Sequence, residues 1–203
     1  MAEVLVLFAS REGQTAKIAR RMAAVLEAKG HRVELRDADT SLGELDLGRY
    51  RVIFVGAPVR YGGYLPSIVR FIRNRREALQ RVPSAFFSVS LAVAHHRNSD
   101  RRNKEGRVET IGVVEKFTRT TGWSPLRIEL IAGALQYSKY NFLIRFLMRR
   151  ISAHAGGDTD TSRDYEYTDW TAVDRFASEF VDQALGTLPV QPGPGRAALQ
   201  PTG

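Results

Sequence analysis

The fold is indicated first by residues 4–15, VLVLFASREGQT. Val4–Phe8 is a short, continuous apolar run of strand-forming residues, which is typical of a strand buried on both faces. A polar loop with Gly13 and Thr15 follows, and from Ala16 to Ala28 apolar residues recur at helical spacing. A buried strand, a polar loop and an amphipathic helix predict the start of a parallel α/β sheet.

The same alternation continues along the chain. Further strands are predicted over Arg32–Arg36, Tyr50–Gly56, Ser84–Ser90 and Ile128–Ala134, and further helices after Pro66, over Val108–Thr121 and over Asp169–Leu185. Strands that alternate with helices predict right-handed crossovers and helices on both faces of the sheet. Five strands fit a flavodoxin-like three-layer α/β fold, with a five-stranded parallel sheet in the order 2-1-3-4-5.

The chain of 203 residues is long enough for one compact domain with a full core, which we expect over residues 1–185. Two segments fall outside the alternation, a polar and basic insertion at about 91–107 and a second insertion at about 135–167. The tail, residues 186–203, is rich in proline and glycine and is expected to be disordered.

Composition excludes several classes of protein. The chain has no cysteine, so disulfides, thiolate metal sites and cysteine nucleophiles are excluded. No stretch reaches the roughly 20 apolar residues that span a bilayer, and the N-terminus lacks the pattern of a signal peptide, which predicts a cytoplasmic protein. The net charge of +8 favours anionic partners, although a solvated basic surface without a partner gives the same balance.

The loop after the first strand has the chemistry of a phosphate site. In open parallel sheets, ligands bind beyond the carboxyl ends of the strands, and a helix N-terminus favours a phosphate. The predicted phosphate-binding residues are Ser10, Arg11, Glu12, Gly13, Gln14 and Thr15. The alternative is ordinary capping of the helix by small polar residues. The loop is neither a P-loop nor a dinucleotide loop.

Two later loops could face a flat ring system at the same edge. The loop after the third strand offers two tyrosines and a glycine-rich backbone, and its predicted contacts are Pro58, Val59, Arg60, Tyr61, Gly62 and Tyr64. The loop after the fourth strand offers backbone groups beside small side chains, through Ser88, Val89, Ser90 and Leu91. Either loop alone would be an ordinary turn, but the three loops together predict a phosphate-bearing ring ligand. His95 and His96 lack an accompanying carboxylate cluster, so we assign no metal.

The second insertion carries a cationic and apolar segment. Residues 139–151 hold four basic residues, Lys139, Arg145, Arg149 and Arg150, and no acidic one. On a helix, a polar stripe would run along an otherwise apolar surface, which is the composition of a helix lying in a membrane interface. The alternative is a helix packed on the sheet with its arginines in water.

Six stretches together resemble one family. They are Ala9–Thr15, Arg60–Tyr64, Pro83–Val89, Ile131–Tyr137, Gly156–Thr161 and Tyr167–Trp170. In this order they resemble the flavodoxin-like, menaquinone-dependent protoporphyrinogen IX dehydrogenases of bacterial haem synthesis. The resemblance runs over roughly residues 3–180, and it is weakest over Ala92–Arg107. Flavodoxins usually carry serine or threonine where this chain has Glu12, which we expect to point away from the phosphate or to cap the helix.

The resemblance implies one non-covalent flavin mononucleotide (FMN), bound by the three loops described above. It implies oxidation of protoporphyrinogen IX to protoporphyrin IX, with menaquinone or another quinone as electron acceptor, on the inner face of the cell membrane. The flavin would perform the redox chemistry, so no catalytic side chain is assigned. The cations of residues 139–151 would serve the substrate propionates or an anionic membrane surface. A homo-oligomer is compatible with the sequence.

Three other functions remain as alternatives. A flavin-dependent quinone or nitro reductase would take its electrons from a nicotinamide nucleotide. An electron-carrier flavodoxin would have no substrate of its own, but such carriers tend to be acidic. Nucleic-acid binding is supported only by the charge, and no nucleic-acid motif is present, so we expect no nucleic-acid partner.

Overall fold

The computed structural model describes residues 1–40, 45–94, 100–139, 142–154 and 159–186. Its main sheet has five parallel strands: β1 (Glu3–Phe8), β2 (Arg32–Asp37), β3 (Val52–Pro58), β4 (Ser84–Ser90) and β5 (Arg127–Ala132). Their order is β2-β1-β3-β4-β5, and all four pairings are parallel. The predicted order 2-1-3-4-5 is therefore confirmed.

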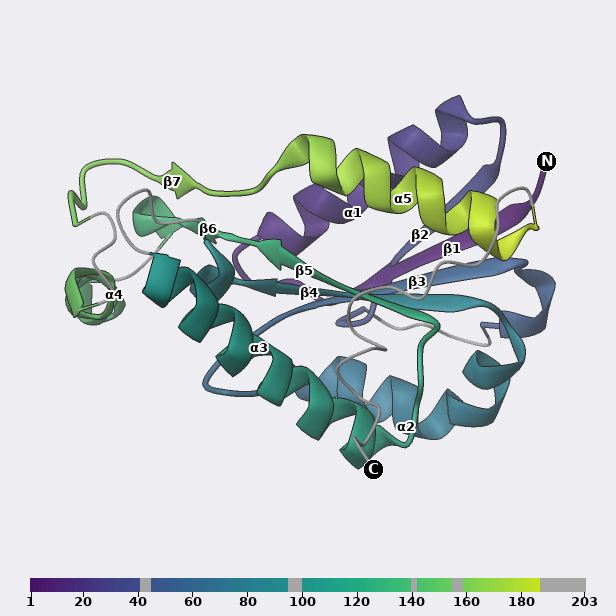
Figure 1. Ribbon diagram of the computed structural model, residues 1–203, viewed down its shortest axis with the longest axis horizontal. Coiled ribbons are helices and arrows are strands. Elements are labelled where there is room, and N and C mark those ends of the chain that lie inside the picture. Colours follow the sequence, from purple (N-terminus) through teal and green to yellow (C-terminus); the bar gives the residue numbers. More distant parts are fainter. Residues whose placement is uncertain (41–44, 95–99, 140–141, 155–158, 187–203) are drawn as a thin grey trace.

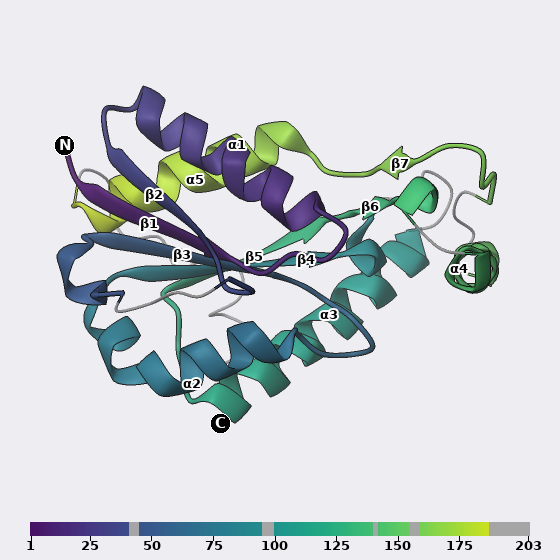
Figure 2. The ribbon, with the colours of Figure 1, turned by 180° about the vertical axis from the view of Figure 1, so that it is seen from behind.

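Four helices cover the two faces of this sheet. They are α1 (Gln14–Ala28), α2 (Pro66–Arg81), α3 (Asp100–Thr121) and α5 (Trp170–Ala184). Figures 1 and 2 show α1 and α5 on one face and α2 and α3 on the other, which gives the three layers.

The burial of β1 shows how one short apolar run stabilises both layers. Successive side chains of a strand point to opposite faces. Val4, Val6 and Phe8 belong to the core beneath α1 and α5. Leu5 and Leu7 belong to the core beneath α2 and α3. A strand with apolar residues on both faces has to lie inside the sheet, and β1 has a neighbouring strand on each side.

Several predicted boundaries differ from the structure. Helix α3 begins at Asp100 rather than Val108, so the second half of the segment 91–107 is helical. Strand β5 ends at Ala132 rather than Ala134, because the chain leaves the sheet at Gly133 and forms a separate short strand, β6 (Ala134–Leu135). Gly133 is packed so closely on β4 that an added Cβ would lie 3.3 Å from Val89 Cγ1.

The second insertion forms a small unit of its own. Strand β6 pairs antiparallel with β7 (Tyr165–Glu166), and between them lie the 3₁₀ turn η3 (Tyr137–Lys139) and helix α4 (Phe142–His154). Of the segment 139–151, Lys139 belongs to η3, and the described helix runs from Phe142 to His154. Most of the predicted tail, residues 187–203, and the pair His95 and His96 lie outside the described residues.

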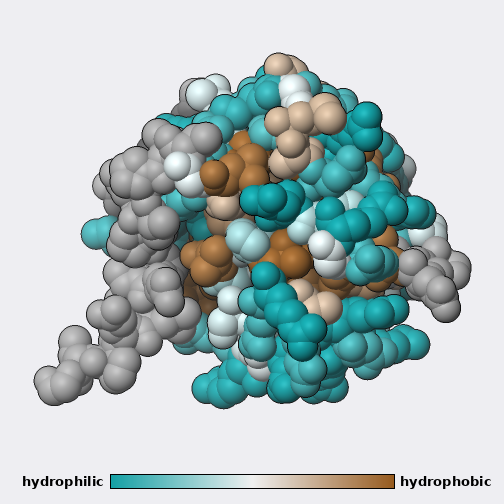
Figure 3. All heavy atoms as spheres, turned by 90° about the vertical axis from the view of Figure 1, so that its right-hand side faces the viewer, coloured by the Kyte–Doolittle hydropathy of each residue, from teal (hydrophilic) through white to brown (hydrophobic). Residues whose placement is uncertain are grey.

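The insertion lies beyond the carboxyl edge of the sheet, at the left of Figure 1, beside the beginning of α1. Figure 3 shows the opposite end of the molecule, where the strands begin, with a largely hydrophilic surface interrupted by hydrophobic residues. The carboxyl edge, with its loops and its insertion, is therefore the end at which the predicted site has to be sought.

Candidate functional site at the carboxyl edge of the sheet

The loop between β1 and α1 leads into the N-terminus of a helix, where the first backbone N–H groups have no acceptor within the helix. Gly13 is the N-terminal cap of α1 and has φ +99°, a left-handed conformation that favours glycine. The hydroxyl oxygen of Ser10 accepts hydrogen bonds from the backbone N–H groups of Gly13 at 3.2 Å and Ala16 at 3.4 Å. The first turn of α1 contains no acidic residue. The positive end of the helix dipole therefore meets no side-chain anion within that turn.

Gln14 and Thr15 are both buried at the start of this helix. The Gln14 amide donates to a Glu166 carboxylate oxygen at 2.7 Å and to the Thr168 hydroxyl at 2.9 Å. The Thr168 hydroxyl in turn donates to the carbonyl of Ala132, at the end of β5. The side-chain amide of Gln14 thus links the loop to the C-terminal end of the second insertion through two hydrogen bonds.

Glu12 does not cap the helix. Its carboxylate forms an ion pair with the guanidinium of Arg60, from the loop after β3. Its backbone carbonyl accepts a hydrogen bond from Lys139 Nζ, at the end of η3. The carboxylate is therefore paired with a cation of the neighbouring loop and not with the N–H groups of α1. Arg11, the adjacent residue, is exposed.

The loop after β3 forms a tight hairpin turn. The N–H groups of Arg60 and Gly63 each donate to the other residue's carbonyl, at 2.8 and 2.9 Å. The two central residues, Tyr61 and Gly62, have φ +49° and +70°, the pattern of a type I′ turn. Positive φ is unusual for a tyrosine, and such strain tends to occur at functional sites. Tyr61 is 90% exposed, so its ring is available to a ligand.

Tyr64 has a different environment from Tyr61. Its ring packs against Phe86 and Phe117, with ring centroids 5.2 and 4.6 Å apart, and its hydroxyl is 2.7 Å from the Ser88 hydroxyl. Burial raises the pKa of Tyr64 well above its ordinary value, so the hydroxyl is neutral. Of the two tyrosines predicted to face a ring, the structure leaves Tyr61 at the surface and uses Tyr64 in the core.

The other residues of the two ring-facing loops are held by the sheet. Pro58 ends β3, and the N–H of Val59 donates to the carbonyl of Val89 at 2.8 Å, so the two loops begin side by side. Ser88, Val89 and Ser90 are buried within β4. Ser90 also caps the turn η2 (Leu91–Val93), because its hydroxyl accepts from the N–H of Ala92 at 3.1 Å. The half-buried Leu91 is the first residue of that turn.

The second insertion is fastened to α1 mainly through Glu166. Lys17 donates to both carboxylate oxygens of Glu166, at 2.9 and 2.7 Å. Burial alone would raise the pKa of Glu166, but the hydrogen bonds from Lys17 and Gln14 outweigh it and hold the pKa below its ordinary value. Glu166 is therefore charged at neutral pH, and it holds the end of the insertion beside the beginning of α1.

Among its described side chains, helix α4 exposes two phenylalanines and two arginines. Phe142 is 81% and Phe146 is 57% exposed, and Arg149 and Arg150 are exposed as well. Arg145 is half-buried. Of the four cations predicted to act together, Lys139 lies at the loop between β1 and α1, apart from the arginines of the helix. Among the described residues, no helix is long and apolar enough to cross a bilayer.

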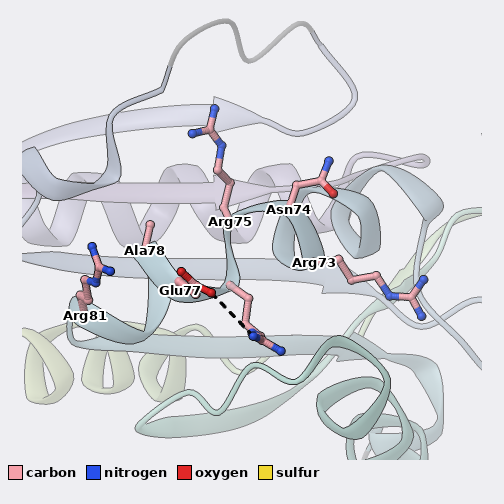
Figure 4. A pocket seen from close by; sticks show the side chains of 7 residues that line it. Arg73, Asn74, Arg75, Glu77, Ala78 and Arg81 are labelled. Atoms are coloured by element: carbon pink, nitrogen blue, oxygen red, sulfur yellow. Dashed lines mark ion pairs between the residues drawn. The ribbon is translucent and has the colours of Figure 1, made fainter.

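A pocket of about 410 Å³ lies elsewhere, along the second half of α2 (Figure 4). Its lining residues are Arg73, Asn74, Arg75, Arg76, Glu77, Ala78 and Arg81. Helix α2 begins at the carboxyl edge, after β3, and runs back toward the start of β4, so this pocket lies away from that edge. It contains none of the predicted site residues.

The sequence did not predict the roles of Glu166 and Thr168. Both lie more than 140 residues from Gln14 in the chain, and only the packing of α5 beside α1 brings them to the loop. A signal for Thr168 existed, because the stretch Tyr167–Trp170 contributes to the family resemblance.

The chain is similar in sequence to known flavodoxin-domain proteins. Residues 5–162 match a family model described as a flavodoxin domain. The chain is 34% identical over 177 residues to "Protoporphyrinogen IX dehydrogenase [quinone]" of Escherichia coli (strain K12), covering 87% of this chain and 93% of that protein. It is 33% identical over 189 residues to the protein of the same name from Leishmania major, covering 91% and 77%. Oxidised Flavodoxin 1 from Bacillus cereus aligns with a TM-score of 0.49 at 14% identity, covering 89% of this chain and 97% of that chain.

Proposed function

The chain belongs to the flavodoxin-domain family of quinone-dependent protoporphyrinogen IX dehydrogenases, and from this premise we propose that it oxidises protoporphyrinogen IX to protoporphyrin IX with FMN as cofactor and a quinone as electron acceptor. The observation that carries the proposal is the meeting of three loops at one edge of the sheet, each with the chemistry that its part of FMN requires. The substrate and the electron acceptor in this proposal are those in the names of the two relatives described above.

The phosphate would be held by the loop from Ser10 to Thr15. Three features of this chain support that fit. The first-turn N–H groups of α1 have no acceptor within the helix, the turn lacks acidic side chains, and Gly13 allows the backbone to approach closely. The carboxylate of Glu12 opposes a phosphate, and its ion pair with Arg60 offsets that charge.

The flavin ring would lie between the loops that follow β3 and β4. The turn at Arg60–Gly63 places the exposed Tyr61 beside the backbone of Gly62, and η2 places Leu91 at the neighbouring rim. When bound, the flavin supplies the redox chemistry, accepting electrons from the porphyrinogen and passing them to the quinone. The role of these residues is to bind and orient the ring, and we assign no side chain as acid or base.

The substrate would approach from the side of the second insertion. Protoporphyrinogen IX has a large apolar macrocycle and two propionates, so it needs an apolar surface and nearby cations. Phe142 and Phe146 supply exposed apolar surface, and Arg149 and Arg150 supply charge. The same features suit a helix that lies in the interface of an anionic membrane, where a hydrophobic quinone is found. We therefore propose peripheral attachment through α4.

The deciding experiment is anaerobic mixing of the FMN-loaded protein with protoporphyrinogen IX. We expect the flavin absorbance to bleach as the first electron pair is taken up. When a quinone is added, the flavin absorbance should return and protoporphyrin IX should appear, with about three quinones reduced per porphyrin because six electrons are removed in pairs. A control replaces the porphyrinogen with a nicotinamide nucleotide. Bleaching by the nucleotide alone would identify a reductase and overturn the proposal.

A further inference from the structure

Lys139 extends from the second insertion to the beginning of α1. Its ammonium group donates to the backbone carbonyl of Glu12, 127 residues away in the chain. A Cβ built on Gly13 would lie only 3.1 Å from Lys139 Nζ, so the ammonium is next to the residue that caps the helix. Lys139 is exposed, and its position is therefore open to a ligand from solvent.

The carboxylates discussed near Lys139 have other ion-pair or hydrogen-bond partners. The carboxylate of Glu12 is paired with Arg60, and among the described residues Lys139 takes part in no ion pair. Asp164, a carboxylate of the insertion, accepts from the Ser138 hydroxyl at 2.5 Å and from the Ser138 N–H at 2.8 Å. These hydrogen bonds, with a smaller contribution from Lys139, hold the pKa of Asp164 below its ordinary value. The carbonyl of Glu12 needs only one of the three ammonium hydrogens.

We propose that Lys139 is a cationic ligand of the FMN phosphate, supplied by the second insertion. The inference rests on the function proposed above. A phosphate at the first turn of α1 would meet the N–H groups of Gln14 and Thr15 on one side and the ammonium of Lys139 on the other. A charge-assisted hydrogen bond from an ammonium is among the stronger contacts for a phosphate. Because Lys139 ends η3 just before α4, the phosphate also holds the beginning of the insertion against the cofactor loop.

A substrate propionate is the other anion that Lys139 could contact, and its chemistry is similar. The contact with Glu12 favours the phosphate, because it places the ammonium beside the helix N-terminus rather than with the arginines of α4. Titrations without substrate distinguish the two sources. If Lys139 contacts the FMN phosphate, replacing Lys139 weakens FMN binding in the absence of porphyrinogen. If Lys139 contacts a substrate propionate, replacing it leaves FMN binding unchanged under these conditions.

The test compares FMN with riboflavin, which has the same ring and no phosphate. In fluorescence titrations of the apoprotein, we expect Lys139→Met to weaken FMN binding on the order of tenfold and to leave riboflavin binding unchanged. Lys139→Arg should restore most of the FMN affinity. Lys29→Met is the matched control, because Lys29 lies just beyond the other end of α1, paired with Asp182. It should change neither affinity. The FMN affinity of the native protein should also fall more steeply with salt than that of Lys139→Met.

Three outcomes would overturn the inference. Equal losses for FMN and riboflavin would mean that Lys139 only shapes the loop through the Glu12 carbonyl. Unchanged affinity for FMN would mean that Lys139 does not contact the phosphate. If the native protein bound no FMN at all, both the inference and the proposed function would fail. If only the inference fails, the native protein still binds FMN, so the two failures can be distinguished. Circular dichroism of each variant confirms that it is folded.

Discussion

Arg60 and Glu12 form an ion pair that joins two of the three loops at the carboxyl edge, the one after β3 and the one after β1. Each side chain is 28% exposed, so the pair is partly shielded from solvent. The sequence placed both residues among the cofactor contacts but did not pair them. The pairing would allow a carboxylate to lie in the loop that we propose to bind the FMN phosphate.

The first prediction concerns the two halves of this ion pair. Arg60→Met leaves the carboxylate of Glu12 unpaired beside the phosphate, so FMN affinity should fall roughly fivefold to tenfold. Glu12→Gln removes the anion and leaves Arg60 free, so FMN affinity should be retained or rise. Fluorescence titration measures both. Equal losses for the two variants would show that the pair only holds the loops together and leaves the phosphate unaffected.

The second prediction separates the two tyrosines of the loop after β3. Tyr61→Ala should weaken FMN binding by about 0.5–1.5 kcal/mol, because the exposed ring is the one available for stacking. Tyr64→Phe should leave FMN affinity unchanged and lower the free energy of unfolding by about 1 kcal/mol, because the contact with the Ser88 hydroxyl is lost. Flavin titration and urea unfolding measure the two effects. If Tyr64→Phe weakened FMN binding and Tyr61→Ala did not, the flavin ring would not lie against Tyr61.

The third prediction uses two glycines of α3. A Cβ on Gly106 would lie 1.8 Å from the carbonyl oxygen of Ala92, in the turn η2, so Gly106→Ala should force α3 away from the ring-facing loop. We expect a loss of about 1–3 kcal/mol in the free energy of unfolding. Gly112 lies in the same helix with nothing within 4 Å of its added Cβ, and Gly112→Ala should stabilise the protein by up to about 1 kcal/mol. Urea unfolding of both variants decides, and a stable Gly106→Ala protein would contradict the close packing.

The fourth prediction tests the membrane role of α4. Reversal of Arg149 and Arg150 to Glu should release the protein from vesicles that contain phosphatidylserine, since each basic residue near an anionic surface contributes about 1 kcal/mol. Arg145 is left in place because it is half-buried. Reversal of Arg75 and Arg81, in the distant second half of α2, changes the net charge equally and should have little effect.

Co-sedimentation across a salt series measures vesicle binding of the two double variants. FMN titration confirms that the cofactor site of each is intact. Binding that weakens with salt is expected of an electrostatic attachment. Equal release by the α2 and α4 variants would show that net charge alone attracts the protein to the membrane. A native protein that does not sediment even at low salt would remove the proposed role of α4.

The sequence by itself determined the layered sheet. Runs such as Val4–Phe8 and Ser84–Ser90 can bury both faces only inside a parallel sheet, and the helical spacing between them defines the crossovers. From this alternation it also follows that the loops after β1, β3 and β4 share one edge, because the carboxyl ends of parallel strands meet there. These properties depend on neighbours within a few residues of one another in the chain, and local patterns report them well.

Only the tertiary structure decided which side chains face the site. Tyr61 and Tyr64 are three residues apart in one loop, yet the positive φ of Tyr61 turns it to solvent while Tyr64 fills a gap beside Phe86 and Phe117. Likewise, the contact of Lys139 with Glu12 depends on how the second insertion folds back over α1. Such contacts join residues distant in the chain, and they arise from the packing of whole elements, which no local pattern of residues specifies.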